Sequence, residues 1–489
     1  MRRALWILAL LAAAVTACRL LLPDRYVVNA PVLNTLLGGH EPPSEAERQR
    51  LRAPEGFSIQ FFAEDLPNAR FLRLTPAGDL LVSRPRAGEV TLLRPDADGD
   101  GRSDGRELLL AGLNRPHGLE LHEGWLYVAE TDAVGRIRFD PRTRRTRGEF
   151  ERVLTGLPGG GNHWSRTVRF GPDGWLYLSV GSSCNVCEEA DARRASLLRL
   201  RPDGSDVQIY ATGLRNAVGF DWRPGTSELY ATDNGRDLLG DDFPPCELNR
   251  VVEGGFYGWP YANGDRVPDP DLGDGRADLI RRSLPPVHDF RAHTAPLGIV
   301  FLRHAPEPEY RGAALVALHG SWNRTRKDGY EVVSLHWRDD GSIEEREFLS
   351  GFELDEDVIG RPVDVVEDER GRIYVSDDYA GAIYRIVRSD AAGMPARPAP
   401  RAAAAPGPPP DPRAVARGLE LYQAHACATC HDPLRAAPGV VASPLTDLAR
   451  RYDRAGLAAL LRTPPSPMPV AALDDAQRDD LARYLLQAF

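Results

Sequence analysis

One pattern of apolar and polar positions recurs six times between residues 72 and 377 of the chain. Each copy has a short apolar stretch, a turn rich in Pro, Asp and Gly, and then a stretch in which apolar and polar residues alternate. Alternation with a period of two predicts strands, and the turn residues predict hairpins. The copies occupy residues 72–82, 117–130, 167–178, 218–233, 297–319 and 363–377.

Six similar hairpins over roughly 330 residues predict a six-bladed β-propeller at residues 55–387, because a propeller blade holds about four strands. A pair of β-sandwiches would not be expected to repeat one hairpin six times. The sequence therefore favours the propeller as the main domain.

The C-terminal part of the chain departs from this pattern. Residues 388–412 are rich in Pro and Ala, which predicts an extended linker. Residues 413–489 have helical character, and Ala476, Leu481, Tyr484 and Leu485 recur there at roughly helical spacing. The expected architecture is thus an all-β propeller followed by a small all-α domain.

The N-terminus has the layout of a secretory signal. Arg2 and Arg3 precede an apolar run at residues 4–17, and the run ends in Val-Thr-Ala before Cys18. This end resembles the lipobox of bacterial lipoproteins, in which the cysteine is lipidated and becomes the mature N-terminus. The alternatives are an ordinary cleaved signal and an uncleaved anchor.

We therefore expect a lipoprotein signal peptide at residues 1–18 and an N-terminal extension at residues 19–54. A lipid anchor at Cys18 would hold the protein in the periplasm or on the outer face of the membrane. Disulfides can persist in either place.

Composition and charge exclude several classes of protein. The chain has 489 residues, 42% of them hydrophobic, which excludes disorder throughout. The only long apolar run is at the N-terminus, so a polytopic membrane protein is excluded. The net charge is −10, Lys327 is the only lysine, and no basic run is present. A nucleic-acid partner is therefore not expected.

Residues 427–431 read Cys-Ala-Thr-Cys-His, the attachment sequence of a c-type haem. Cys427 and Cys430 would form the two thioether bonds, and His431 would be the proximal ligand of the haem iron. No histidine follows His431, so Met468 is the candidate for the second axial ligand. Together these features resemble a class I cytochrome c.

Three further cysteines are Cys184, Cys187 and Cys246. Because their number is odd, at most one disulfide can form among them. Cys184 and Cys187 could also be a redox pair or half of a zinc site, but no second pair of ligands appears at zinc-like spacing. A structural disulfide or inert thiols are favoured, and the pairing stays open.

Residues 96–107 match the twelve-residue loop of an EF-hand, with Gly101 at the position of the sharp turn. The flanking residues 90–93 and 108–110 predict strands, so we expect a structural calcium site in a blade hairpin rather than a helix-loop-helix sensor. The alternative is an acidic solvated turn. The expected ligands are Asp96, Asp98, Asp100, Asp104 and Glu107.

Polar clusters fall at the junctions of strands and loops where the central site of a propeller would form. Arginines and asparagines with one histidine suit a polyanionic cofactor with a proton acceptor beside it. The clusters are at residues 161–164, 214–216, 233–236, 319–324 and 360–362.

Together these clusters resemble the sorbosone dehydrogenase-like and soluble glucose dehydrogenase-like quinoproteins, six-bladed propellers that use pyrroloquinoline quinone (PQQ). The resemblance covers most of the predicted propeller. It implies that His163 is the general base and that Arg215 and Asn216 contact PQQ. It also implies that the backbone carbonyls of Gly235 and Arg236 hold a calcium ion that bridges to PQQ.

The sequence departs from that family at two places. Where soluble glucose dehydrogenases have a lysine on the quinone, this chain has Asn323 or Arg324, and Lys327 is not well aligned. Where they have an R-x-R pair, this chain has Arg361 and, two positions on, Val363 in place of the second arginine. We still expect Asn323, Arg324 and Arg361 to contact the cofactor.

The combined expectation is a quinohaemoprotein that oxidises a sugar, sugar aldehyde or polyol with PQQ. Electrons would pass to the haem and then to an external acceptor. Loops at residues 238–245 and 267–278 are expected to set the substrate specificity. The alternatives are a calcium-dependent, lactonase-like propeller hydrolase or a binding module tethered to a cytochrome, and a pure electron-transfer scaffold.

Overall fold

The computed structural model describes residues 24–29, 31, 43–389, 412–431, 445, 448, 452, 454–462, 464 and 468–488. The chain divides into two compact units, Met1–Ala396 and Arg397–Phe489, and each is described by itself. The predicted signal peptide with Cys18, and the linker beyond residue 389, lie outside the described residues. Their boundaries therefore stay predictions.

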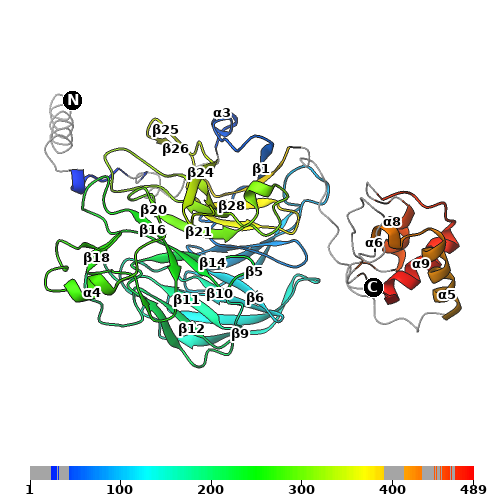
Figure 1. The fold of residues 1–489 in the computed structure, drawn as a ribbon, viewed down its shortest axis with the longest axis horizontal. Helices are drawn as coiled ribbons and strands as arrows, with labels where there is room; N and C mark the ends of the chain where they lie inside the picture. Colours follow the sequence, from blue (N-terminus) through cyan, green and yellow to red (C-terminus); the bar gives the residue numbers. More distant parts are fainter. Residues whose placement is uncertain are drawn as a thin grey trace, which may run out of the picture. The chain divides into compact units, whose positions relative to one another are not determined.

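The first unit is a six-bladed β-propeller, which confirms the fold predicted from the repeats (Figure 1). Each blade contains a four-stranded antiparallel sheet. Blade 1 has β2 (Leu72–Leu74), β3 (Leu80–Arg84), β4 (Glu89–Leu93) and β5 (Arg106–Leu110); blade 2 has β6 (Leu119–His122), β7 (Trp125–Ala129), β8 (Ala133–Asp140) and β9 (Arg145–Thr155); blade 3 has β10 (Val168–Phe170), β11 (Leu176–Val180), β12 (Ser196–Leu200) and β13 (Gln208–Thr212). Blade 4 has β14 (Ala217–Trp222), β15 (Leu229–Asp233), β16 (Cys246–Val251) and β20 (His288–Phe290); blade 5 has β21 (Pro296–Phe301), β22 (Ala314–Leu318), β23 (Glu331–Trp337) and β24 (Ile343–Leu349); blade 6 has β27 (Pro362–Glu367), β28 (Ile373–Asp377), β29 (Ala382–Arg388) and β1 (Phe57–Ala63).

Each sequence repeat corresponds to the first two strands of one blade. The first strands lie around the central channel, where β2 contacts β6 and β27, β6 contacts β10, and β21 contacts β14 and β27. The second strand of each blade is almost wholly buried; β11, β15, β22 and β28 have no exposed residue. The alternation read from the sequence therefore does not correspond to a solvent-exposed face, because the polar residues of these strands, such as Thr232 and Ser376, are buried as well.

The ring of blades is closed by the N-terminal strand. β1 is the outer strand of blade 6 and pairs with β29, with Phe57 opposite Arg388 and Ala63 opposite Ile383. The last blade is thus assembled from both ends of the propeller sequence. This pairing holds blade 6 beside blade 1.

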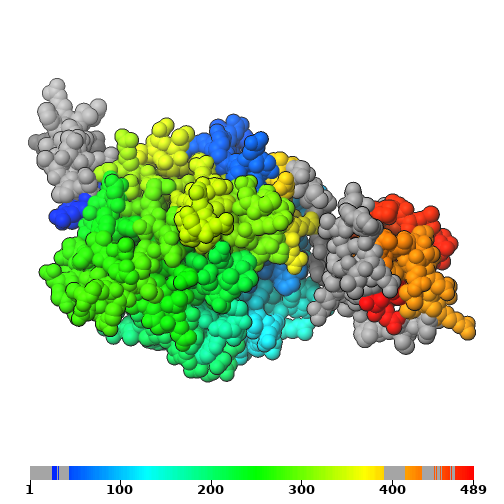
Figure 2. Space-filling view, viewed as in Figure 1, coloured from blue at the N-terminus to red at the C-terminus, as the bar shows by residue number. Residues whose placement is uncertain are grey.

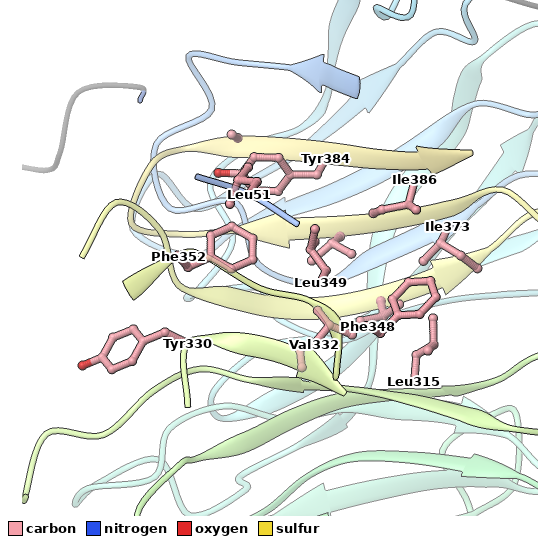
Figure 3. Packing of buried hydrophobic residues seen from close by; sticks show 14 of the residues in the cluster. Leu51, Leu315, Tyr330, Val332, Phe348, Leu349, Phe352, Ile373, Tyr384 and Ile386 are labelled. Carbon is pink, nitrogen blue, oxygen red and sulfur yellow. The ribbon is translucent and has the colours of Figure 1, made fainter. Parts of the chain in front are cut away.

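The hydrophobic core consists of six clusters, one between each pair of neighbouring blades. Figure 3 shows the cluster between blades 5 and 6, to which Tyr384 and Ile386 of β29, Val332 of β23 and Leu349 of β24 belong. The cluster between blades 6 and 1 contains Phe62 of β1. Stability therefore resides in contacts between blades, as expected when each sheet is apolar on both faces.

Short elements extend the loops between these strands. Between β16 and β20, the chain forms β17 (Gly255–Phe256), which pairs in parallel with β13, then β18 (Ala262–Asn263), β19 (Val267–Pro268) and α4 (Ala277–Arg282). β18 and α4 lie at the outer edge of the propeller in Figure 1, and the same green lobe projects in the space-filling view (Figure 2). The remaining short elements are η1 (Asp24–Tyr26), α3 (Glu45–Arg48), η2 (Pro308–Tyr310), β25 (Glu353–Leu354) and β26 (Asp357–Val358).

The second unit is helical, as predicted, with α5 (Pro412–Ala424), α6 (Ala428–His431), α8 (Arg454–Arg462) and α9 (Asp475–Ala488). α9 contacts both α5 and α8. Its buried residues include Leu481 and Leu485, as the helical spacing predicted. Of the other two residues in that pattern, Tyr484 is half-buried and Ala476 is exposed. Among the helices of the described residues, none is long and apolar enough to cross a membrane.

Phe62→Ala tests the role of the closing strand. Phe62 is 1% exposed and its ring lies 5.1 Å from that of Tyr374 on β28. Removing a buried phenyl ring should lower the free energy of unfolding by about 3–5 kcal/mol. Urea unfolding followed by tryptophan fluorescence measures this, because all tryptophans except Trp6 lie within the propeller sequence.

Ser58→Ala on the same strand is the control, since its hydroxyl makes one exposed hydrogen bond to Ser389. It should change the free energy of unfolding by less than about 0.5 kcal/mol. Equal effects of the two substitutions would show that β1 does not lock the ring through its buried face.

Candidate functional site

Polar residues gather at one end of the central channel. They lie in the segments that lead into the first strands, namely Arg70 before β2, His117 before β6, His163 before β10, Arg215 before β14 and Arg361 before β27. Equivalent strands of a propeller run in the same direction, so these segments reach the same end of the channel. We call this end the polar face.

Contacts between the segments confirm that they meet. The ring of His117 lies 5.5 Å from that of Trp164, the residue after His163. The guanidinium carbons of Arg70 and Arg115 lie 5.7 and 3.9 Å from the Trp164 ring centre. Residues far apart in sequence thus surround one indole ring.

The hydrogen bonds of His163 fix the tautomer whose Nε2 can accept a proton. Its Nδ1 lies 2.9 Å from the backbone oxygen of Ser182 and 2.9 Å from the Ser182 hydroxyl. A carbonyl oxygen can only accept, so Nδ1 carries the proton and Nε2 keeps its lone pair. Burial and the nearby Arg215 lower the pKa of His163 to about 3. The imidazole is therefore neutral at physiological pH.

A glycine brings His163 next to Asn216. A Cβ atom at Gly181 would lie 2.6 Å from both the Asn216 Oδ1 and the His163 Cβ. Any larger residue would push the two side chains apart. The structure therefore supports the proximity of these residues that the resemblance implied.

The guanidinium of Arg215 is buried and is used by the protein itself. It donates to the carbonyls of Asn234 and Gly235 at 3.1 and 2.9 Å, and to the backbone and side-chain oxygens of Asn185 at 2.9 and 2.8 Å. An ion pair to Asp237 at 3.2 Å completes the set. A contact of this guanidinium with PQQ, as the resemblance implied, would have to replace one of these bonds. Arg215 is thus a positioning residue in this structure.

Cys184 and Cys187 form a disulfide, and Cys246 is a buried free thiol. This settles the pairing that the sequence left open. The loop closed by the disulfide carries Asn185, and the Cys184 carbonyl accepts a hydrogen bond from the Ser182 hydroxyl at 2.7 Å. The disulfide therefore lies between the group that orients the histidine and the group that orients the arginine.

A second polar cluster on this face joins His319 and Arg361, which lie in two of the predicted clusters, to Asp378, which the sequence did not single out. His319 and Arg70 both bind the buried carboxylate of Asp378, at 2.9 and 2.5 Å. Burial opposes ionisation of Asp378, yet His319, Arg70 and Arg361 hold its pKa far below the usual range. Arg361 donates to the carbonyls of His319 and Gly320 at 3.1 and 3.2 Å. No local motif marks Asp378, because its partners come from three different blades.

The predicted cofactor contacts of Asn323 and Arg324 differ from what the structure shows. The Asn323 amide bonds to the backbone of Leu238 and of the N-terminal segment around η1, so each of its polar atoms has a protein partner. Arg324 donates to the backbone oxygens of Asp241 and Ala292 at 2.6 and 3.2 Å. Both residues hold neighbouring loops in place.

Lys327, the only lysine, likewise bonds to other protein groups and not to residues of the polar face. Its Nζ lies 3.0 Å from Asn29 Oδ1 and 2.9 Å from the backbone oxygen of Glu356. It therefore ties the N-terminal segment to the β25–β26 hairpin. This arrangement agrees with its poor alignment to the quinone-binding lysine.

The segment predicted to hold calcium lies beside a pair of buried acids. Gly235 offers its carbonyl to Arg215, and the Arg236 guanidinium pairs with Asp269 at 2.7 Å. Behind them, Asp233 on β15 lies opposite Glu247 on β16. Burial raises the pKa of both carboxyl groups, and each negative charge opposes the other. Two such acids can share a proton or hold a divalent cation.

The EF-hand-like loop joins β4 to β5, as predicted. Carboxylate oxygens of Asp96, Asp98 and Asp104 lie within 4.8 Å of one another, close enough to share a cation. The other two predicted ligands are elsewhere, because Asp100 caps a backbone N–H and Glu107 on β5 pairs with an arginine that follows β4. Asp96 also pairs with a buried arginine of β29. The structure thus brings three of the five predicted ligands together.

The haem motif begins just before α6 and continues along it. Cys427 and Met468 are both half-buried and both pack against the apolar core of the second unit. The cysteine thiols of Cys427 and Cys430 are free, and His431 ends the helix. A thiol and a thioether on one apolar core fit the predicted attachment and axial ligation of a haem.

The fold and the site define a propeller with a histidine and several arginines at one end of its channel, joined to a haem-attachment unit. Residues 127–385 match the family described as glucose/sorbosone dehydrogenase, and residues 413–485 match cytochrome c oxidase, cbb3-type, subunit III. The first match covers more than half of the chain. This chain belongs to the glucose/sorbosone dehydrogenase family and carries a cytochrome c domain.

Two curated proteins are similar to large parts of this chain. An uncharacterized protein of Borreliella burgdorferi is 30% identical over 289 residues, 56% of this chain and 76% of that protein. The PQQ-dependent pyranose dehydrogenase of Coprinopsis cinerea is 24% identical over 427 residues, 71% of this chain and 56% of that protein.

Solved structures share the fold. The holo form of the Coprinopsis cinerea pyranose dehydrogenase PQQ domain superposes with a TM-score of 0.60 at 22% identity, covering 74% of this chain and all of that one. A calcium structure of a Trichoderma reesei family AA12 protein gives 0.61 at 22% identity, covering 69% and 97%.

The acid pair predicts a pH dependence of stability. A carboxyl group whose pKa is higher in the folded than in the unfolded chain loses its stabilising effect as pH rises, because the unfolded chain releases the proton first. The free energy of unfolding should therefore fall between about pH 4 and pH 8. Glu247→Gln should reduce that fall, measured by urea unfolding with EDTA present. Glu253→Gln, at an exposed position, should leave it unchanged; an identical pH profile for wild type and Glu247→Gln would contradict the account.

Proposed function

We propose that this protein is a PQQ-dependent dehydrogenase of sugars, sugar aldehydes or related polyols that passes electrons through a c-type haem to an external acceptor. The observation that carries the proposal is the half-buried imidazole of His163, which is neutral and whose Nε2 lone pair can accept a proton at the polar face. Family membership supports an oxidoreductase over a lactonase-like hydrolase. The haem unit supplies a reason for the fusion, since a two-electron oxidation needs a one-electron exit.

The polar face fits a flat, polyanionic cofactor such as PQQ. Arg115 lies over the Trp164 ring, and burial together with the like charges of Arg70 and Arg86 lowers the pKa of Arg115. Crowded cations of this kind are stabilised by an anion placed among them. Arg361 uses Nε and one terminal nitrogen on carbonyls, and the other terminal nitrogen remains for a carboxylate.

PQQ, when bound, supplies the two-electron oxidation. The protein's own residues supply orientation and proton transfer. His163 accepts the proton of the substrate hydroxyl at Nε2, while its Nδ1–H bond to Ser182 fixes the ring. Arg215 and the disulfide loop would hold Ser182, Asn216 and the Gly235 carbonyl in place around the site beside His163.

Calcium is part of the proposal at two places. The carbonyls of Gly235 and Arg236 would face the cofactor, and the carboxylates of Asp96, Asp98 and Asp104 would hold a structural ion in blade 1. Oxygen donors of both kinds are the ligands that calcium prefers. Titration of the metal-free protein with calcium, followed by thermal unfolding, tests both.

Substrate choice and location complete the proposal. The loops at residues 238–245 and 267–278 would contact the sugar. The signal-like N-terminus and Cys18 would place the protein outside the cytoplasm as a lipoprotein, where it would meet a cytochrome or quinone acceptor. Metabolic labelling with a fatty acid, with Cys18→Ser as the unlabelled control, tests the anchor.

His163→Gln tests the proposed base. Loss of general-base catalysis typically costs 10²–10⁴-fold in rate, so kcat for sugar oxidation with a dye acceptor should fall by at least about 100-fold while PQQ retention stays unchanged. His304→Gln, at an exposed histidine, should leave kcat unchanged. An active His163→Gln enzyme would remove the histidine from the mechanism.

The pH profile gives an independent readout of the same group. Because the pKa of His163 is lowered to about 3, the base stays unprotonated well below pH 6.5. The value of kcat/KM should therefore stay flat as the pH falls through 6.5. An acid limb centred near 6.5 would contradict a buried neutral histidine as the base.

Replacing both haem cysteines separates the two units. Cys427→Ala with Cys430→Ala should abolish covalent haem, seen as loss of haem staining after denaturing electrophoresis. Dye-linked sugar oxidation should persist, whereas reduction of a protein acceptor should be lost. Loss of the dye-linked activity as well would contradict the proposal that the propeller oxidises the sugar without the haem.

A further inference from the structure

The opposite end of the central channel holds a cavity of about 470 Å³. Every blade contributes one charged residue to it, from the later part of its first strand or just beyond. Positive and negative residues alternate around the ring in blade order. They are Arg73, Glu120, Arg169, Asp221, Arg303 and Glu367.

This cavity is separate from the polar face. Phe71, Val218, Leu297 and Val363, from four of the first strands or the residue just before one, form a buried apolar cluster in the channel. Phe71 also packs against His117 of the polar face, with ring centres 4.1 Å apart and the ring planes tilted by 39°. The apolar cluster therefore lies between the two ends.

Five members of the charged ring have partners in a neighbouring blade. Arg73 forms an ion pair with Glu120. Arg303 binds the carboxylate of Asp221 through two nitrogens, at 2.9 and 3.0 Å. Glu367 accepts the backbone N–H groups of Arg303 and its successor, at 2.6 and 3.0 Å.

Arg169 is the exception. Its ring neighbours, Glu120 and Asp221, are each engaged with the arginine on their other side. Within the part of the chain that the structure describes, Arg169 has no hydrogen bond or ion pair, and its Nε is buried without a partner. The buried Asp364 lies near enough for its ionised form to be favoured by Arg169, yet no hydrogen bond joins them.

Like charges also crowd this end of the channel. Burial lowers the pKa of Arg73, and the positive charges of Arg169 and Arg303 lower it further. A ring of ion pairs that served only to hold blades together would give Arg169 a hydrogen-bonded acid, as it gives one to Arg73 and to Arg303. The unused guanidinium faces a cavity within the size range of small-molecule sites.

We propose that this cavity binds a small organic oxyanion, whose carboxylate or phosphate group is held by Arg169. A guanidinium matches either group through two parallel N–H donors. Phe170 and Trp222 provide apolar wall for the remainder of the molecule. The site is distinct from the proposed sugar site and does not depend on it.

Isothermal titration of the full-length protein without added PQQ tests the proposal. The probes are inorganic phosphate, gluconate as a carboxylate of sugar size, and glucose as the uncharged analogue of gluconate, all at constant ionic strength set with sodium chloride. We expect saturable binding of at least one of the two anions and none of glucose. Whether phosphate or gluconate binds identifies which oxyanion the site takes.

Arg169→Met should weaken binding of that anion by about tenfold or more, since it removes a charge-assisted pair of hydrogen bonds. Arg169→Lys should recover part of it. Arg142→Met removes one exposed positive charge on the rim of blade 2 and should leave the affinity unchanged. Circular dichroism and the Tm of each variant without anion verify folding.

Two results would overturn the proposal. One is no binding of either anion to the wild type. The other is binding that Arg169→Met and Arg142→Met change equally, which would show that the anions respond only to net charge. Neither outcome bears on sugar oxidation, because no turnover is measured.

Discussion

The structure depends on closure of the ring. Each blade is a sheet with two apolar faces, and each face is buried only if a neighbour lies on that side. Six blades satisfy this condition only when the last lies against the first. The pairing of β1 with β29 stabilises that contact, because β1 belongs to blade 6 and the chain continues from it into blade 1. Closure also fixes the first strands around one channel. The chemistry of the protein follows from what the segments before and after those strands carry.

The candidate site is therefore a network rather than a motif. His163 faces Asn216 because Gly181 leaves no side chain between them. Ser182 and Asn185 connect the disulfide loop to the histidine and the arginine, so the acid–base group and the loop carbonyls are positioned by the same few residues. Most of the arginines at this end serve the protein's own oxygens. The few that remain partly unused, on either side of the apolar cluster, are where ligands are expected.

The sequence predicted the inner hairpins of all six blades because each has a Pro-, Asp- or Gly-rich turn followed by alternating apolar residues, and both features are local. It did not predict that β1 completes blade 6, since nothing in residues 57–63 indicates a partner more than 300 residues away. The haem motif was readable because its five residues are contiguous. The disulfide was left open because spacing alone does not fix the geometry of a loop.

The sequence proposed site residues where short stretches resemble the family pattern, and it gave no signal for residues whose contacts depend on distant partners. Asn323 was expected at the cofactor, but its amide is used by the segment around η1, about 300 residues earlier in the chain. Asp378 was missed because its partners, Arg70 and His319, come from other blades. Such pairings form only in the closed ring, so no short stretch of sequence predicts them.

The most direct test of the central claim is the absorption spectrum of the haem in the full-length protein. Aldoses are added one at a time, with and without PQQ and calcium, and the reduced haem bands are recorded. The haem is expected to be reduced only when PQQ, calcium and a sugar are all present. A haem that forms normally but stays oxidised with every sugar, in a protein that retains no PQQ after gel filtration, would contradict it.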